Sequence, residues 1–349
     1  MGRNHIRPIF LSMNILAIES SCDETAAAIC IDGEILNSVV LSQEIHTQFG
    51  GVVPEYASRE HDSQIHRIVN TALEKAALNL TDLDAIAVTY GAGLAGALHV
   101  GLNYAKGLSI GLNIPFVGVN HLEGHLYASF LAYPDLKYPY LCFLVTGGHT
   151  QIWEVTAPGD YTLHSNTVDD AAGEAFDKGA RILGLTYPGG PEIEKLAKHG
   201  NTQLFPFPVP VVKSQPMNFS FSGLKTALLY KSQKLDKDYF EENKAHIAAG
   251  YQDAIINTLL NRLEMVIEKT GLDYISITGG VAANKAFRQK ADILAEERNL
   301  HFYFPPIKYC TDNAAMIAIA GYHYIKAGTF SNLELQANPN LALNDTLMA

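Results

Sequence analysis

The sequence of 349 residues is poor in cysteine, with four in all, and contains a single tryptophan. The cysteines are dispersed and form no CxxC pair: Cys22, Cys30, Cys142 and Cys310. This pattern excludes a disulfide framework and a thiolate zinc site, and it is typical of a reducing compartment. We expect these cysteines to be buried packing residues rather than nucleophiles.

Long apolar runs are also missing. No run reaches the roughly 18 residues that a transmembrane helix needs, and the segment before Asn14 has no apolar stretch long enough for a secretory signal. With 48% hydrophobic and 17% charged residues, the composition is that of an ordinary globular protein, and the length allows two domains. We therefore expect a two-domain cytoplasmic protein.

Positively charged residues are outnumbered: 25 lysines and arginines stand against 36 aspartates and glutamates, which gives a formal net charge of −11. This balance argues against a protein that binds nucleic acid through phosphate contacts over its whole surface. Between Lys195 and Lys237, however, there are seven lysines and one acidic residue, Asp236. This stretch is either an ordinary solvated surface or a local basic strip that faces a polyanion.

Apolar runs, turns and amphipathic stretches alternate along the first part of the chain, as in an α/β fold. The pattern predicts strands at Ile15–Ile18, Ala26–Ile31, Ile35–Leu41, Ala85–Thr89 and Phe116–Val119, and helices at Ala57–Lys75 and Ala97–Leu112.

The same order begins again after Pro139. It predicts strands at Tyr140–Val145, Gln151–Val155, Tyr161–Asn166 and Tyr274–Thr278, and helices at Glu174–Leu183, Ile247–Glu268 and from Asn284. Two successive units of this kind indicate a duplicated α/β plan with a cleft between the halves. The stretch near 200–238, rich in proline and lysine, is predicted to be an insertion or a long functional loop.

Three turns follow buried strands and are built from small residues: Ser20-Ser21-Cys22, Thr146-Gly147-Gly148 and Gly279-Gly280. Such turns let backbone N–H groups approach a phosphate closely. None is a GxGxxG or Walker motif, so the sequence supports neither a dinucleotide-binding fold nor a P-loop kinase. Together they predict a nucleotide-binding cleft.

His121 and His125 are one helical turn apart, so their imidazoles share a face and suit a metal ion. Two imidazoles are too few, and Asp312 is a candidate third ligand. Its alternative role is the N-cap of the helix predicted to start at Ala314.

The segment His121–His125 superficially resembles the zinc protease motif. That motif needs a glutamate directly after the first histidine, where it can reach the metal-bound water. Glu123 is instead two positions on, about 200° around the helix. We expect it to point away from the imidazoles.

An acidic cluster lies where a helix is predicted to start: Asp169, Asp170, Glu174 and Asp177. We expect helix capping to explain most of it, with ribose or general-base work as the alternative.

Eight ordered segments together resemble the TsaD family, from about Ile15 to Gly328. They are Gly50–His61, Lys106–His125, Val145–Thr150, Asp169–Lys178, Tyr187–Pro191, Phe219–Thr226, Gly279–Asn284 and Cys310–Asn313. The resemblance implies an α/β fold of the actin-like, sugar-kinase and Hsp70 type, with two duplicated lobes and an interlobe cleft. The N-terminal lobe would cover 14–130, with 315–345 packing back on it, and the C-terminal lobe 131–314, with the insertion near 200–238.

The reaction implied by this resemblance moves the threonylcarbamoyl group of threonylcarbamoyl-AMP onto N6 of adenosine 37 in tRNAs that read codons beginning with A, releasing AMP. His121, His125 and Asp312 would be the metal ligands, with iron as the ion and zinc as the alternative. The positions matching adenylate-binding residues are Leu144, Val145, Thr146, Gly147, Gly148, Asp177, Gly190, Glu194 and Asn284. Asp177 and Glu19 are the candidates for a general base.

The implied partners are tRNA, an actin-like paralogue of the TsaB type and a small P-loop ATPase of the TsaE type. Three positions depart from the family's common residues, namely Ala92, Thr146 and Ala282. The alternatives are a metallopeptidase, a non-catalytic actin-like scaffold of a tRNA-modification complex, and a sugar or acid kinase. The displaced Glu123 argues against the first, and retention of both histidines with Asp312 argues against the second. No sugar-binding motif supports the third.

Overall fold

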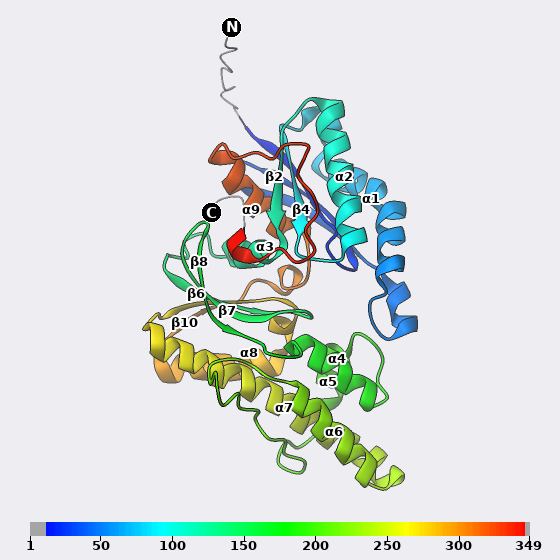
Figure 1. Cartoon of the computed structure of the whole chain (residues 1–349), viewed down its shortest axis with the longest axis vertical. Helices are drawn as coiled ribbons and strands as arrows, with labels where there is room; N and C mark the ends of the chain where they lie inside the picture. Colours follow the sequence, from blue (N-terminus) through cyan, green and yellow to red (C-terminus); the bar gives the residue numbers. More distant parts are fainter. Residues whose placement is uncertain (1–11, 346–349) are drawn as a thin grey trace. The chain divides into compact units, whose positions relative to one another are not determined.

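The computed structural model describes residues 12–345 (Figure 1). The chain divides into two compact units. The first contains the described residues up to Ser42, together with Ser58–His121 and Asn313–Leu341. The second contains Gln43–Ala57, Leu122–Asp312 and the described residues from Ala342 onward.

The first unit is built on a mixed five-stranded sheet in the order β3-β2-β1-β4-β5. β1 and β2 pair antiparallel, as do β2 and β3, whereas β4 and β5 extend the other side of β1 in parallel. Its strands are β1 (Asn14–Glu19), β2 (Glu24–Ile31), β3 (Glu34–Ser42), β4 (Ala85–Gly91) and β5 (Phe116–Asn120).

Helices cover both faces of this sheet (Figure 1). Leu16 and Ile18 of β1 share a core with residues of α1 (Pro54–Ala76) and α2 (Ala95–Leu112). α9 (Ala314–Lys326) lies against all five strands. A Cβ at Gly321 of α9 would come within 2.4 Å of the Ala87 Cβ, so glycine lets this helix approach the sheet closely.

The second unit repeats the strand plan, in the order β10-β9-β6-β7-β8. Again a three-stranded antiparallel meander is extended in parallel on the far side of its first strand. The strands are β6 (Tyr140–Val145), β7 (Thr150–Ala157), β8 (Asp160–Asn166), β9 (Tyr274–Thr278) and β10 (His301–Tyr303). The predicted duplication is confirmed.

One face of the second sheet packs on an aromatic core, in which the Phe143 ring stacks on Phe219 at 5.7 Å and meets Phe287 edge-on at 6.1 Å. The other face packs on α3 (His121–Tyr127) through Leu122 and Leu126. The remaining helices are α4 (Ala172–Ile182), α5 (Gly189–Ala197), α6 (Ser222–Lys234), α7 (Lys237–Thr270) and α8 (Lys285–Arg298).

The prediction of a long loop near 200–238 is wrong from Ser222 onward, where α6 begins. α7 also starts ten residues earlier than the predicted Ile247. Its N-terminus is fixed by Asp236, whose carboxylate accepts hydrogen bonds from the Asp238 and Tyr239 N–H groups. The irregular part that remains is held by Arg262, whose guanidinium donates to the Pro210 and Asn218 carbonyls.

All four cysteines are free thiols, and three of them are buried. Burial raises the pKa of the Cys30 thiol to about 11 and that of Cys142 to about 12, which keeps both thiols protonated. Burial agrees with the predicted packing role of Cys30, Cys142 and Cys310, whereas Cys22 is only half-buried. Among residues 12–345, no helix has both the length and the apolarity to cross a membrane.

Candidate functional site

His121 is the first residue of α3, directly after β5, and His125 lies one helical turn later. Both are buried. Asp312 lies just before α9 and is half-buried. Each of the three side chains offers one ligand atom, and these atoms all lie within 4.8 Å of one another. The convergence predicted from the sequence is therefore present, although 187 residues separate His125 from Asp312.

The N-cap role considered for Asp312 is wrong, because Asn313 fills it. The Asn313 carboxamide oxygen accepts a hydrogen bond from the Met316 N–H at 3.1 Å. The Asp312 carboxylate instead lies with its Oδ1 atom 3.1 Å from Nε2 of His125. The capping residue and the candidate ligand are thus neighbours in the chain with separate tasks.

A buried carboxylate fixes the ring of His121. Its Nδ1 atom lies 3.1 Å from Oε2 of Glu19 and 3.1 Å from Oγ of Ser21. Glu19 is fully buried and also accepts hydrogen bonds from the Thr89 hydroxyl (2.5 Å) and the Ser21 N–H (2.6 Å). A carboxylate can only accept, so Nδ1 of His121 carries the proton and Nε2 presents its lone pair.

This donor set fits a metal ion. Two atoms bonded to one ion at about 2.0–2.2 Å and adjacent to each other are roughly 3 to 3.5 Å apart, which agrees with the 3.1 Å between His125 and Asp312. A histidine that donates its second ring N–H to a carboxylate is the usual arrangement of a metal-binding imidazole. The cluster can therefore hold a metal ion.

Glu123 lies between the two histidines in the chain but is engaged elsewhere. It is fully buried, and its Oε1 atom accepts a hydrogen bond of 2.6 Å from the Tyr161 hydroxyl on β8. The buried carboxylate raises the pKa of Tyr161 further than burial alone, so this phenol stays protonated and donates. A glutamate held in this way does not serve as the base of a peptidase.

The second group of predicted residues centres on the β6–β7 turn. Leu144 and Val145 end β6 and are buried, whereas Gly147 and Gly148 are exposed. Thr146 organises the turn: its N–H donates to the His149 carbonyl (2.8 Å), and its hydroxyl accepts from the His149 N–H (2.9 Å). Of the three amides predicted to hold a phosphate, those of Thr146 and Gly148 are thus engaged inside the turn, since the Gly148 N–H also donates to the Thr146 hydroxyl at 3.3 Å.

Helix α4 begins against this turn. The Gly173 N–H donates to the Thr146 carbonyl at 3.2 Å, and a Cβ at Gly173 would come within 2.7 Å of the Gly147 Cα. One helical turn farther on, the Asp177 carboxylate accepts a hydrogen bond of 2.7 Å from the Gly189 N–H. Asp177 therefore joins α4 to the first turn of α5, which carries Gly190.

Helix α5 is joined in turn to α8. The Glu194 carboxylate accepts a hydrogen bond of 3.0 Å from the Lys285 N–H. The Asn284 side chain caps α8 by accepting from the Phe287 N–H, and it donates to the Gln252 amide oxygen at 2.9 Å. Both predicted side chains therefore hold the start of α8 in place.

Gly279, directly after β9, returns this series of contacts to the β6–β7 turn. Gly279 has φ +100°, and a Cβ there would come within 2.4 Å of the Val145 carbonyl oxygen, so only glycine fits. We call this series of contacts the substrate ring. It runs from the β6–β7 turn through α4, α5 and α8 and returns to the turn at Gly279. All nine predicted adenylate positions belong to it: Leu144, Val145, Thr146, Gly147, Gly148, Asp177, Gly190, Glu194 and Asn284.

The substrate ring has the features of an anion site. A Cβ added at Gly147, Gly148 or Gly190 would meet no atom within 4 Å, so these backbones border open space. The N-termini of α4, α5 and α8 all belong to the ring, and helix N-termini favour negative charge. The open backbone at these three glycines leaves room for a phosphate group, whereas first-turn N–H groups of all three helices are already bonded within the protein.

The acidic cluster is not the N-terminal cap of α4 that the sequence suggested. The N-cap of α4 is Ala171, without a side-chain bond. Asp170 forms an ion pair with Lys178 at 2.7 Å. Asp169 instead holds the start of α6: it accepts from the Phe221 N–H at 2.7 Å and from the hydroxyls of Ser220 (2.5 Å) and Ser222 (2.7 Å).

Sequence reasoning missed two residues that the structure adds. Thr89 reaches Glu19 because β4 pairs in parallel with β1, a register that aligns Ile18 with Val88. Gln252 reaches Asn284 from the middle of α7. The polar character of Thr89 within an otherwise apolar strand was the available signal for the first, and the second carried no signal.

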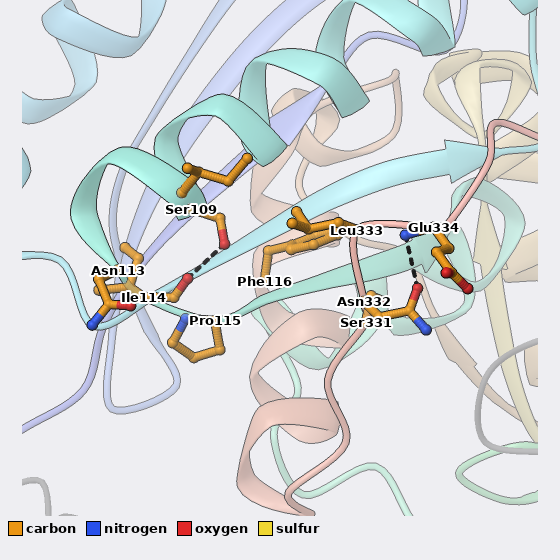
Figure 2. A pocket seen from close by; sticks show the side chains of 10 residues that line it. Ser109, Asn113, Ile114, Pro115, Phe116, Ser331, Asn332, Leu333 and Glu334 are labelled. Atoms are coloured by element: carbon orange, nitrogen blue, oxygen red, sulfur yellow. Dashed lines mark hydrogen bonds between the residues drawn. The ribbon is translucent and has the colours of Figure 1, made fainter.

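A pocket of about 810 Å³ in the first unit contains none of the predicted site residues (Figure 2). It lies where the end of α2 meets the start of β5 and the segment 331–334. In Figure 2 the Ser109 hydroxyl donates to the Ile114 carbonyl beside it. No metal-binding or nucleotide-binding prediction concerned this region.

Comparison with known sequences gives matches along most of the chain. A family model described as TsaD, tRNA N6-adenosine threonylcarbamoyltransferase, matches residues 34–319. The protein of Thermosipho africanus named tRNA N6-adenosine threonylcarbamoyltransferase is 51% identical over 332 residues, which cover 95% of this chain and 100% of that protein. A protein of the same name from Clostridium perfringens is 48% identical, over 95% of this chain and 98% of its own.

Solved structures agree in fold. Full-length HypF in its phosphate- and nucleotide-bound form is 13% identical with a TM-score of 0.61, and the match covers 91% of this chain and 47% of HypF. This chain thus spans about half the length of HypF. The activator of the 2-hydroxyisocaproyl-CoA dehydratase from Clostridium difficile is 16% identical with a TM-score of 0.52, over 90% of this chain and 97% of the activator. These likenesses confirm the predicted actin-like, sugar-kinase and Hsp70 type of fold.

The family model covers most of the chain, and relatives of about half-identical sequence extend along 95% of it. The protein therefore belongs to the TsaD family, the tRNA N6-adenosine threonylcarbamoyltransferases.

Proposed function

We propose that this protein transfers the threonylcarbamoyl group of threonylcarbamoyl-AMP to N6 of adenosine 37 in tRNAs that read codons beginning with A, and that AMP leaves. The observation that carries the proposal is the approach of His121, His125 and Asp312 to within 4.8 Å in a chain of this family. The substrate ring supports it with a second set of groups that suits a phosphate.

His121, through Nε2, together with His125 and Asp312 would hold one metal ion. Imidazole nitrogens with one carboxylate oxygen suit iron and zinc, and we assign iron, with zinc as the alternative. When bound, such an ion supplies Lewis acidity to substrate oxygens. Glu19 keeps the His121 ring in the orientation and tautomer that this requires.

The substrate ring would bind the adenylate half of the donor. The exposed Gly147 amide and the first turn of α5 at Gly190 would offer N–H groups to the phosphate. Asp177, Glu194 and Asn284 hold α4, α5 and α8 around it through the contacts described above. Their removal would therefore enlarge and loosen the ring rather than delete a single ligand contact.

The donor is a mixed anhydride and is already activated, so the protein has mainly to orient it and to stabilise charge. The adenine amine attacks the carbonyl carbon, the bond from that carbon to the phosphate oxygen breaks, and the amine loses a proton. Of the two candidate bases, Asp177 and Glu19, the contacts argue against Glu19. Glu19 is fully buried and accepts hydrogen bonds at both of its oxygens.

We further propose that the protein works in the cytoplasm on tRNA, with an actin-like paralogue of the TsaB type and a small P-loop ATPase of the TsaE type. The family name, which specifies a tRNA adenosine, supports the tRNA substrate. The contact of Glu123 with Tyr161 argues against the metallopeptidase alternative, and the intact triad of His121, His125 and Asp312 argues against a non-catalytic scaffold.

The test is incubation with synthetic threonylcarbamoyl-AMP and unmodified tRNA, followed by mass spectrometry of the nucleosides. We expect threonylcarbamoyl-adenosine with the intact protein and a loss on the order of a hundredfold or more for His121→Ala and Asp312→Ala. Asn313→Ala is the matched control, since it removes the adjacent cap and costs about 1 kcal/mol of stability without removing a ligand. Full activity of both alanine variants would contradict the metal assignment.

A further inference from the structure

Helix α6 carries three lysines and no acidic residue in a chain whose net charge is −11. The ammonium groups of Lys225 and Lys234 form no ion pair and no hydrogen bond with any of the described residues 12–345. The third lysine, Lys231, lies with its ammonium 4.9 Å from the centre of the Phe207 ring. Within the described part of the chain, none of the three ammonium groups is therefore paired with a carboxylate.

The helix dipole accounts for only part of this charge. Lys231 and Lys234 are in the last turn, where a cation is favourable. Lys225 is the fourth residue of the helix, close to the N-terminus, where a cation is unfavourable and an acidic residue is the usual choice.

The position of α6 connects this charge to the substrate ring. Asp169, three residues before the start of α4, binds both the Phe221 N–H and the Ser222 hydroxyl at the start of α6. α6 also packs on α4. The 13 residues of α6 extend for about 20 Å from this anchor.

The solvent face of α6 has the composition of a surface that binds a nucleic acid backbone. Thr226, Leu229, Tyr230 and Gln233 are exposed on it, with Tyr230 58% and Leu229 37% exposed. At 3.6 residues per turn, Lys225 and Lys234 lie at the two margins of this face. A mostly polar face with an aromatic ring, bordered by a lysine on each side, suits sugar and phosphate groups.

Acidic residues limit this surface at its far end. They belong to the start of α7, where Asp236 is engaged as the N-cap and Glu241 pairs with Lys244 at 2.6 Å. We call the face formed by Lys225, Tyr230 and Lys234 the α6 surface.

We propose that the α6 surface binds the sugar–phosphate backbone of the substrate RNA next to the target adenosine. The inference rests on the proposed function, because it assigns a position to the tRNA of that reaction. A nucleotide that enters the substrate ring is joined to further phosphates on both sides. In a strongly acidic protein these phosphates need a local set of uncompensated cations.

The sharpest test is Lys225→Glu. This change is favourable for the helix dipole, and a thermal melt of the variant shows whether the new carboxylate disturbs the Asp169 anchor at Ser222. We expect the Kd for a labelled anticodon stem–loop to rise about tenfold, and the slope of log Kd against log salt to fall by about 1. In the transfer assay the KM for tRNA should rise while the KM for threonylcarbamoyl-AMP stays constant.

The double variant Lys225→Glu/Lys234→Gln should weaken binding further. Its control is Lys137→Glu/Lys269→Gln, which makes the same change of net charge at two exposed lysines elsewhere in the second unit. The control should stay within about twofold of the parent protein, since its charges are outside the RNA path.

Equal losses in both double variants would overturn the inference, because net charge alone would then explain them. Unchanged RNA affinity in Lys225→Glu would overturn it too, as would a change confined to the KM for threonylcarbamoyl-AMP. The proposed function fails in a different way, namely when the parent protein binds RNA but forms no modified adenosine.

Discussion

The two units have the same strand order, yet the turn after the first strand is closed in one and open in the other. In the first unit, Ser20 and Ser21 are buried, and the Ser20 hydroxyl donates to the Ala97 carbonyl of α2. In the second, Gly147 and Gly148 are exposed and border open space. The turn in the first unit supports His121 through Ser21, whereas the turn in the second unit leaves its backbone exposed at Gly147 and Gly148.

The difference follows from the residues around each turn. Beside the first, Gly93 lies so close that its Cβ would come within 2.5 Å of the Ser21 carbonyl oxygen, and Leu94 N–H donates to that oxygen. Beside the second, α4 meets the turn through Gly173 and the chain after β9 meets it through Gly279, but neither covers Gly147 and Gly148. The difference in exposure between the two turns is therefore due more to the loop at Gly93 and Leu94, which covers the first turn, than to the turn sequences themselves.

The largest effect should come from adding one methyl group near each turn. Gly93→Ala places a Cβ against the Ser21 backbone at a φ of +152°, and it should cost on the order of 3 kcal/mol of stability. Gly148→Ala should leave stability within about 0.5 kcal/mol and raise the KM for threonylcarbamoyl-AMP severalfold, because the methyl group occupies ligand space. Urea denaturation and steady-state kinetics measure the two effects.

Gly107→Ala is the control for both variants, since a Cβ there also meets no atom within 4 Å but is on α2, away from both turns. A similar loss of stability in Gly93→Ala and Gly148→Ala would show that the two turns are closed alike, against the contrast drawn here.

The second prediction concerns the closed turn. Glu19→Gln keeps the shape of the side chain but replaces one accepting oxygen with a donor, so Nδ1 of His121 loses the partner that fixes its tautomer. Metal affinity should fall by about 10- to 100-fold, measured by competition with a chromophoric chelator. Thr89→Val is the milder comparison, because it removes one donor to Glu19 and leaves the carboxylate in place. Unaltered affinity in Glu19→Gln would show that the closed turn does not position the ligand.

The smallest effect should come from Asp169, which anchors α6 near the open turn. Burial raises its pKa, but hydrogen bonds from the Ser220 hydroxyl, the Phe221 N–H and Ser222 outweigh burial and lower the pKa below 3.8. A lowered folded-state pKa gives stability that is present above the unfolded value and lost as the pH falls through the folded value. Asp169→Asn should therefore cost on the order of 1 kcal/mol near neutral pH.

The difference between the parent protein and Asp169→Asn should be constant above about pH 5 and shrink below about pH 4. Thermal melts of both proteins across this range measure it. A gap that widens toward acid would contradict the assigned direction of the pKa shift.

The sequence predicted the strands well where burial on both faces produces continuous apolar runs, as in β1, β4 and β6. It predicted poorly where an element depends on a distant contact. β10 has three residues, and its one partner in the sheet is β9. α6 was missed because its start is held by Asp169, more than fifty residues earlier in the chain.

The candidate site shows the same division. His121, His125 and Asp312 were predicted from residue type and family motif, and they converge. The roles of Glu19 and Asn313 could not be predicted, because a carboxylate or an amide serves equally as base, cap or support. Which task each performs is decided by strand register and by a one-residue difference in where α9 begins.

The distance along the chain between His125 and Asp312 has a practical consequence for any preparation of this protein. An ion held by both residues closes a loop of 187 residues, and it binds the native state but has no preformed site in the unfolded chain. Loaded and unloaded molecules will then unfold at different temperatures, so a melting curve measures how much of a sample carries metal. Rates from two preparations can be compared only after their melting curves have been shown to coincide.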